Sequence, residues 1–136
     1  MSDGLLTDSD RELIDAAKQA LYDRFEPGRF RTSCGLLTES GEIYTSINLV
    51  TTIGAAETHC EPIAVGMAIM DGHTEFSTSV AVNFPEDNPE REPQVVSACG
   101  VCRELLWDIA PGIDVIVPGA EGPEKVALTE LLPAKG

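Results

Sequence analysis

Two short stretches, residues 59–61 (His-Cys-Glu) and residues 99–102 (Cys-Gly-Val-Cys), contain side chains that bind metals well. His59, Cys99 and Cys102 together offer one imidazole and two thiolates, a ligand set that suits zinc. Three protein ligands leave the fourth tetrahedral position open for water, as in catalytic sites, whereas structural zinc sites normally use four protein ligands. The two stretches therefore predict a catalytic zinc site.

Glu61 lies two positions after His59 and is expected to face the same region without binding the metal. A carboxylate placed there suits proton transfer from a zinc-bound water, whose pKa the metal lowers from about 15.7 toward 7. Both stretches are expected at helix N-termini, where the helix dipole and the backbone amides favour thiolate over thiol. Hydroxide could therefore form there at neutral pH.

Three other interpretations of these residues stay open. Cys60 could replace His59 as the first ligand, although its spacing to Glu61 is then short by one. The two cysteines of residues 99–102 could form a thioredoxin-like redox pair, an interpretation that predicts a preceding strand and no role for His59. A structural zinc site could use Glu61 as its fourth ligand. Cys34, in an alternating strand, is expected to be a small buried apolar residue.

Apolar periodicity predicts the order helix, strand, strand, helix, strand, helix, strand, strand. A capping box formed by Ser9 and Glu12 begins the first helix, and Pro27 with Gly28 ends it. The other elements are expected at about residues 30–38, 42–50, 60–70, 77–84, 103–109, 113–117 and 124–128.

These elements predict an α/β fold, a three-layer α/β/α sandwich with a mixed five-stranded sheet. Residues 85–93 contain three prolines and four acidic residues without an apolar side chain. The chain on either side is too short for two cores, so this segment is expected to be a solvated loop, and residues 1–136 a single domain.

The charge of the chain excludes one class of partner. Nine Lys and Arg oppose 23 Asp and Glu, for a formal net charge of −14. The basic residues are scattered, whereas proteins that bind a nucleic-acid polymer need a basic stripe. The acidic surface fits either ordinary solubility or a high-salt host.

No segment predicts a membrane span or an export signal. The longest apolar run, residues 62–70, falls well short of the roughly 20 residues that a bilayer requires. The N-terminus lacks the basic start and apolar stretch of a secretory signal, so a cytoplasmic location is expected. Four cysteines in a reducing compartment favour metal or thiolate chemistry over disulfides.

The order of these motifs resembles the cytidine deaminase superfamily, specifically the small homotetrameric branch of cytidine deaminase and blasticidin-S deaminase. His-x-Glu followed by Cys-x-x-Cys is close to the signature of zinc-dependent nucleobase deaminases. The resemblance spans nearly the whole chain. It also includes the hairpin that follows residue 30, Asn48 eleven residues before His59, and the stretches 72–76, 99–106 and 131–133.

The resemblance implies hydrolytic deamination of a free cytosine-type nucleoside, cytidine or deoxycytidine, with release of ammonia. His59, Cys99 and Cys102 would hold Zn²⁺, and Glu61 would move protons between water, the ring nitrogen and the departing ammonia. A role in pyrimidine salvage and a homo-oligomer, a tetramer or a dimer, are also implied.

The same resemblance implies a set of substrate contacts. Phe30 would line the base pocket, Asn48 would bind the ribose, the backbone around Cys60 would contact the base, and carbonyls near Ala98 would face the amine.

Three positions depart from the family pattern. Val50 replaces a glutamate that grips a sugar hydroxyl, and losing such a bond costs about 1.5–3 kcal/mol unless another group, such as Glu57, replaces it. Ala98 replaces a proline, which should loosen its loop, and Pro62 replaces an arginine that a His ligand makes less necessary.

The missing glutamate keeps two other functions open. One is deamination of a modified cytosine nucleoside of the blasticidin-S type or of another small aminated heterocycle. The other is a non-catalytic, zinc-stabilised oligomeric binding protein.

Overall fold

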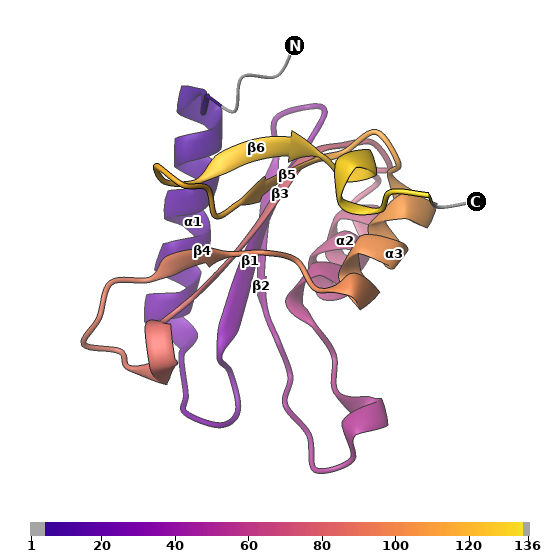
Figure 1. Ribbon diagram of the computed structural model, residues 1–136. Helices are drawn as coiled ribbons and strands as arrows, with labels where there is room; N and C mark the ends of the chain where they lie inside the picture. Colours follow the sequence, from indigo (N-terminus) through magenta and orange to yellow (C-terminus); the bar gives the residue numbers. More distant parts are fainter. Residues whose placement is uncertain (1–4, 135–136) are drawn as a thin grey trace.

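The first described element is a capped helix, α1 (Asp8–Arg24). The computed structural model describes residues 5–134 (Figure 1). Thr7, rather than the predicted Ser9, is the N-cap: its Oγ1 accepts a hydrogen bond from the Asp10 amide, and the Asp10 carboxylate accepts one from the Thr7 amide. The Asp10 carboxylate also forms a 3.0 Å ion pair with Lys125, so one side chain both caps α1 and contacts β6.

A mixed sheet forms the centre of the protein. Its strands are β1 (Thr32–Thr38), β2 (Ile43–Ile47), β3 (Phe76–Asn83), β4 (Gln94–Val96), β5 (Asp114–Val117) and β6 (Glu124–Ala127). Five of them follow the order β2-β1-β3-β5-β6 across the sheet. The sixth strand, β4, pairs with β3 but is not part of this linear order. Among the strand pairs within residues 5–134, only β3–β5 is parallel, which confirms the mixed sheet. The predicted count of five was wrong because β4 is only three residues long and follows the proline-rich loop.

Helices cover both faces of the sheet, which confirms the three-layer sandwich (Figure 1). α1 lies on one face, and α2 (Cys60–Met70) and α3 (Gly100–Ile109) lie on the other. Each face has its own apolar cluster. Leu13 and Leu21 of α1 pack with Phe84, and Ala64 of α2 and Leu106 of α3 pack on the opposite side. None of the helices within residues 5–134 has the length and apolar character needed to cross a membrane.

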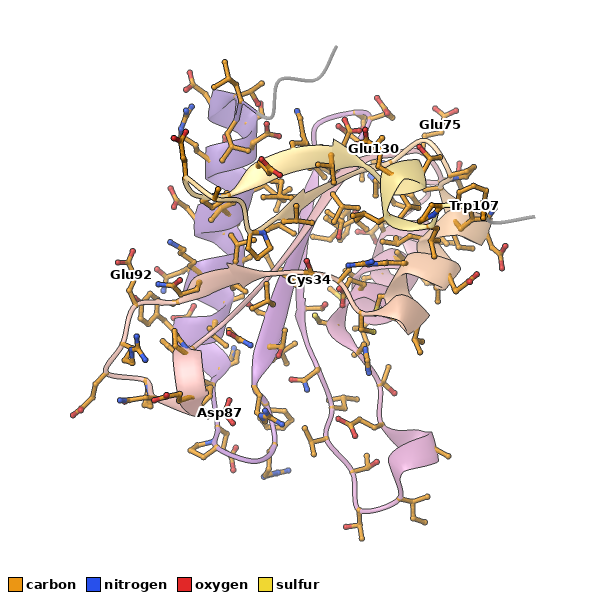
Figure 2. All side chains as sticks on the ribbon, in the orientation of Figure 1. Cys34, Glu75, Asp87, Glu92, Trp107 and Glu130 are labelled. Carbon is orange, nitrogen blue, oxygen red and sulfur yellow. The ribbon has the colours of Figure 1, made fainter. Side chains whose placement is uncertain are left out.

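Two positions on β1 show how closely the helices pack on the sheet. A Cβ added to Gly35 would lie 2.9 Å from Leu13 Cδ1 and 3.1 Å from the Leu13 carbonyl oxygen, so the absence of a side chain lets α1 approach. The adjacent Cys34 is fully buried against the opposite layer, as its alternating pattern predicted, and lies at the centre of the molecule in Figure 2.

Candidate functional site

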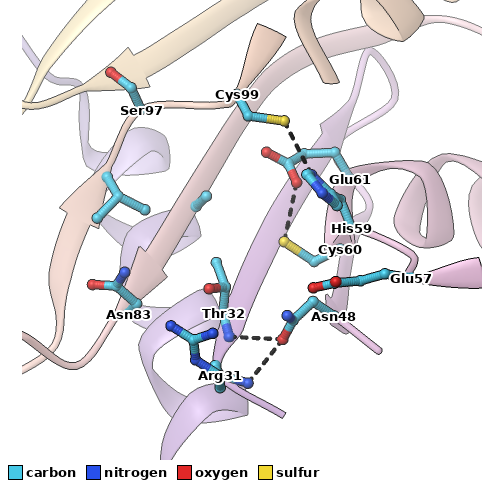
Figure 3. A pocket seen from close by; sticks show the side chains of 12 residues that line it. Arg31, Thr32, Asn48, Glu57, His59, Cys60, Glu61, Asn83, Ser97 and Cys99 are labelled. Atoms are coloured by element: carbon cyan, nitrogen blue, oxygen red, sulfur yellow. Dashed lines mark hydrogen bonds between the residues drawn. The ribbon is translucent and has the colours of Figure 1, made fainter. Parts of the chain in front are cut away.

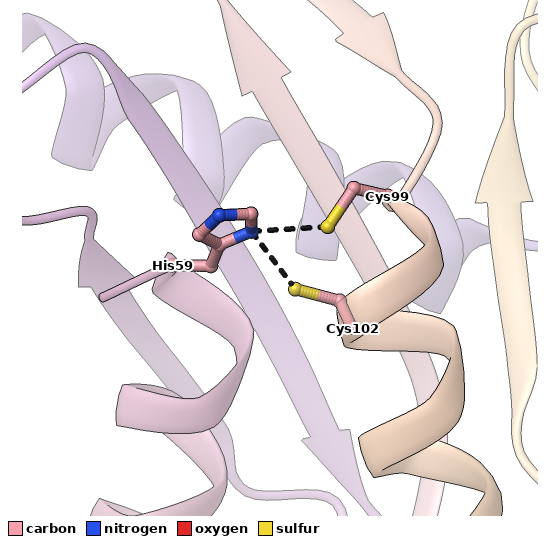
Figure 4. A group of neighbouring side chains, drawn as sticks. All are labelled: His59, Cys99 and Cys102. Atoms are coloured by element: carbon pink, nitrogen blue, oxygen red, sulfur yellow. Dashed lines mark hydrogen bonds between the residues drawn. The ribbon is translucent and has the colours of Figure 1, made fainter. Parts of the chain in front are cut away.

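The predicted metal ligands come from the N-termini of two neighbouring helices. His59 is the N-cap of α2, Cys99 is the N-cap of α3, and Cys102 lies in the first turn of α3. Neither N-cap side chain bonds to its own helix, and both turn toward each other (Figure 4). His59 Nδ1 lies 3.0 Å from Cys99 Sγ and 3.4 Å from Cys102 Sγ.

These three donor atoms fit a zinc ion. All of them lie within 4.8 Å of one another. Typical Zn–S and Zn–N bond lengths place sulfur and nitrogen about 3.6 Å apart in a tetrahedron, close to the distances observed here. Burial and the negative charge of Glu61 raise the pKa of the Cys102 thiol, and a divalent cation would reverse this effect and hold the thiolate. The donor set therefore suits a tetrahedral site with three protein ligands.

Glu61 occupies the second position of α2 and is 5% exposed. Its Oε1 accepts a hydrogen bond from the Cys60 thiol over 3.1 Å. A hydrogen bond with Cys34 and burial raise the pKa of the Cys60 thiol, so Cys60 stays protonated and acts as the donor. Cys60 lies outside the group of metal donors found within residues 5–134, so the structure favours His59 over Cys60 as the first ligand.

Arg103 holds the segment that leads into Cys99. Its Nε donates to the Ala98 carbonyl over 2.8 Å, and its Nη1 donates to the Leu131 carbonyl over 3.2 Å. One side chain therefore ties the loop before α3 to the turn near the end of the described chain. Such a tie restricts the positions that the N-terminus of α3 can take.

A cavity of about 340 Å³ opens beside the donor group (Figure 3). The predicted site residues His59, Cys60, Glu61, Cys99 and Asn48 all contribute to its wall. The remaining lining residues are Arg31, Thr32, Glu57, Ala81, Asn83, Val96 and Ser97. Two of the three metal donors, His59 and Cys99, thus share one cavity with the buried carboxylate of Glu61 and several polar side chains, whereas Cys102 is fully buried outside its wall.

Asn48 is brought near His59 by an antiparallel bridge between Leu49 and Thr58. Its Oδ1 accepts hydrogen bonds from the backbone amides of Arg31 and Thr32, at 2.8 and 2.9 Å. Because the oxygen is used in this way, the side-chain NH₂ group is the part of Asn48 that can bind a ligand.

Position 50, where the family has a glutamate, and Glu57, its suggested replacement, differ in their relation to the cavity. Glu57, suggested as a replacement for the missing glutamate, lines the cavity, whereas Val50 does not. Two other predicted contact residues lie outside the lining. The Arg29 guanidinium lies 4.9 Å from the Phe30 ring centre, and the Ala98 carbonyl is bonded to Arg103. Their contacts with substrate stay predictions.

Sequence reasoning missed several of the polar residues in the cavity wall. Arg31 immediately precedes β1 and Asn83 ends β3, and the sheet register places Thr32 opposite Asn83. Their location at strand ends is the available signal, because side chains at strand ends can reach a neighbouring site. That signal gains meaning only when the pairing of β1 with β3 is known.

Comparison with known proteins assigns the chain to a family. No family model matches it. The chain is 33% identical over 131 residues to blasticidin-S deaminase of Bacillus cereus, and the match covers 96% of this chain and 94% of that protein. The chain belongs to the cytidine deaminase superfamily. It is a zinc-dependent deaminase, and His59, Cys99 and Cys102 form a site typical of zinc in that superfamily.

Solved structures agree with this assignment of the deaminase. The cytidine deaminase from Bacillus anthracis superposes with a TM-score of 0.78 at 26% identity, covering 91% of this chain and 86% of that one. The cytidine deaminase from Burkholderia pseudomallei gives a TM-score of 0.74 at 22% identity, covering 95% and 98% of the two chains, and shows the shared fold.

Proposed function

We propose that this deaminase hydrolyses the exocyclic amine of cytosine in a free nucleoside, with cytidine and deoxycytidine as its substrates. The observation that carries the proposal is the position of Glu61, which is buried beside the metal donors and lines the same cavity as His59 and Cys99. The same cavity contains Asn48 and Glu57, which can bind sugar hydroxyls. The deaminated nucleosides would enter pyrimidine salvage.

His59, Cys99 and Cys102 would hold the metal, which when bound supplies a Lewis acid that acidifies water. Glu61 then moves the protons. Its carboxylate accepts a proton from the attacking water and delivers it to the ring nitrogen next to the amine-bearing carbon. Glu61 later carries the second proton of the water to the amine nitrogen, which leaves as ammonia. The net reaction exchanges the amine for an oxo group at the cost of one water.

The other cavity residues orient the substrate. The NH₂ group of Asn48 donates to a sugar oxygen, and the Glu57 carboxylate accepts from a sugar hydroxyl, the contact that Val50 cannot make. The backbone at Cys60 contacts the base. Phe30 and the carbonyl of Ala98 are further proposed contacts, and both would have to turn toward the cavity when substrate binds.

Blasticidin S is the second candidate substrate. The 33% identity to the Bacillus cereus blasticidin-S deaminase supports it, because that match covers almost all of both chains. Val50 supports it as well, since the carboxylate expected in a nucleoside deaminase of this branch is missing at that position. Both candidates present the same cytosine amine to Glu61.

We further propose a homo-oligomer, in which tetramers or dimers cover apolar side chains of α2 and α3, the helices whose N-termini hold the metal donors. Met67 and Met70 of α2 are 44% and 86% exposed, and Val101 of α3 is 68% exposed. Burying such side chains stabilises an association by about 25 cal/mol per Å² of apolar surface. Light scattering should give a mass above that of one chain at micromolar concentration. A clean monomer would contradict this proposal.

An ammonia-release screen with the zinc-loaded protein tests the proposed substrate. Cytidine, deoxycytidine, blasticidin S, adenosine and guanine are compared at low and high salt. Turnover of cytidine and deoxycytidine supports the proposal, and turnover of blasticidin S alone supports the second candidate. Ammonia released only from the purine compounds would overturn both.

A further inference from the structure

Arg31 is the cationic side chain in the wall of the cavity. Its backbone amide is fixed by the Asn48 side chain, and its Nε forms a 3.0 Å ion pair with Asp87 Oδ2. The Arg31 side chain is 45% exposed, so it contacts both the wall and solvent. In Figure 3 it lies at the opposite end of the group of residues from Cys99, away from the metal donors.

The guanidinium of Arg31 keeps most of its donors. An arginine offers five N–H donors in a planar fork, and Asp87 is bonded to Nε. Within residues 5–134, no other side chain forms an ion pair with this guanidinium. A free fork of N–H groups matches the oxygens of a carboxylate or a phosphate, with which it forms two parallel hydrogen bonds.

The chemistry of the ring decides which part of a substrate meets Arg31, and this step rests on the proposed function. In cytosine, the amine-bearing carbon and the nitrogen that carries the sugar lie on opposite sides of the ring. When the amine-bearing carbon faces Glu61 and the metal donors, the sugar faces the other end of the cavity. Figure 3 shows Arg31 at that end, with Asn83 and Glu57 drawn on opposite sides of it.

A neutral nucleoside leaves this arginine without an anionic partner other than Asp87. We propose that Arg31 recognises an anionic group, a carboxylate or a phosphate, on the sugar portion of a cytosine substrate. The enzyme then prefers anionic cytosine nucleosides to neutral ones. Asp87 holds the guanidinium in place in the free enzyme and yields part of this bond to the substrate anion.

A comparison of three substrates tests the proposal: cytidine, cytidine 5′-monophosphate and cytidine 5′-carboxylate. The readout is the ratio of kcat/KM for each anionic compound to that for cytidine. In the Arg31→Gln variant this ratio should fall about tenfold to hundredfold, the effect of losing one charged hydrogen-bonded contact. Arg29→Gln is the matched control, because Arg29 has the same charge, is exposed and lies outside the cavity wall. It should leave the ratio unchanged.

A second variant removes the competitor. Asp87→Asn frees the Arg31 guanidinium and should raise the same ratio severalfold. A preference for the phosphate or for the carboxylate identifies which anion the site accepts, and either one supports the proposal.

The outcomes separate this inference from the proposed function. If wild-type enzyme deaminates cytidine and the ratio is the same in wild type, Arg31→Gln and Arg29→Gln, the Arg31 inference is wrong while the proposed function holds. If wild-type enzyme releases ammonia from none of the three compounds, the proposed function fails and this inference fails with it.

Discussion

The thiol of Cys60 donates a hydrogen bond to Oε1 of Glu61 over 3.1 Å, inside the first turn of α2. Cys60 is itself fixed, because its carbonyl accepts a 2.5 Å hydrogen bond from Ser46 Oγ on β2. Cys60, which lies between His59 and Glu61 in the sequence, is therefore a positioning residue for the Glu61 carboxylate. It leaves Oε2 as the oxygen without this bond.

This arrangement predicts a graded effect of substitutions at Cys60. Cys60→Ala removes the donor and should lower kcat about threefold to tenfold, since a thiol is a weak donor and its loss costs less than a full hydrogen bond. Cys60→Ser keeps a donor and should restore most of kcat, with KM for cytidine nearly constant in both variants. Equal losses in the two variants would show that packing, rather than the hydrogen bond, explains the effect.

Metal content should distinguish two equally buried thiols. Cys34 and Cys102 are both 0% exposed, but only Cys102 belongs to the donor group. Cys102→Ala should reduce zinc well below one ion per chain and abolish ammonia release, because a site with two protein ligands binds zinc weakly. Cys34→Ala should keep the zinc of the wild type. Metal analysis after dialysis measures both, and zinc retention by Cys102→Ala would refute the assigned ligand set.

The packing of α1 on β1 predicts that Gly35→Ala destabilises the protein. The new methyl group would lie 2.9 Å from Leu13 Cδ1 and 3.1 Å from a backbone oxygen, and such overpacking costs about 1–3 kcal/mol. Gly66→Ala is the control, since its added Cβ meets nothing within 4 Å and alanine favours the helix by about 0.5–1 kcal/mol. Urea unfolding should therefore shift in opposite directions for the two variants.

The Asp10–Lys125 ion pair predicts a pH-dependent stability. Burial raises the pKa of Asp10, but hydrogen bonds from Thr7 and the charge of Lys125 outweigh it, and the net pKa lies below the usual 3.8. The folded state therefore favours the carboxylate, and its stabilisation is complete above pH 3.8 and is lost as the pH falls through the lower folded value. Asp10→Asn should lower the unfolding free energy by about 1–3 kcal/mol at neutral pH.

Asp114 gives a control of opposite sign. Burial, more than the charge of Asp10, raises the pKa of Asp114 despite Lys125 nearby. Its folded state favours the protonated acid, so this residue contributes less stability at neutral pH than in acid. Urea unfolding at several pH values should show that Asp114→Asn does not reproduce the loss seen in Asp10→Asn. A constant deficit for Asp10→Asn from neutral pH to well below pH 3.8 would contradict the linkage argument.

Local sequence signals predicted the limits of α2 and the hairpin of β1 and β2, which depend on residues close together in the sequence. α2 begins and ends where its apolar pattern indicated, and the motifs placed His59 and Cys99 at helix N-termini, which the structure confirms. α3 begins at Gly100, three residues before the predicted Arg103. The low helix propensity of glycine explains why the sequence pattern missed this first turn. The hairpin of β1 and β2 is confirmed, since its turn is also local.

Features that depend on long-range pairing were harder to predict. β4 contains only Gln94–Val96, and its status as a strand depends on pairing with β3. Arg31 resembles an ordinary surface charge until the pairing of Thr32 with Asn83 places it at a cavity wall. The ion pair of the capping residue Asp10 with Lys125, which lies more than one hundred residues away in the sequence, is likewise invisible to local patterns.

The Glu61→Gln variant tests the central claim most directly, with zinc content and ammonia release from cytidine measured on the same sample. Glutamine keeps the size of the side chain but cannot shuttle protons, so zinc should remain at one ion per chain while kcat falls about 10²- to 10⁴-fold. Release of ammonia by Glu61→Gln at the wild-type rate, with zinc present, would contradict the account.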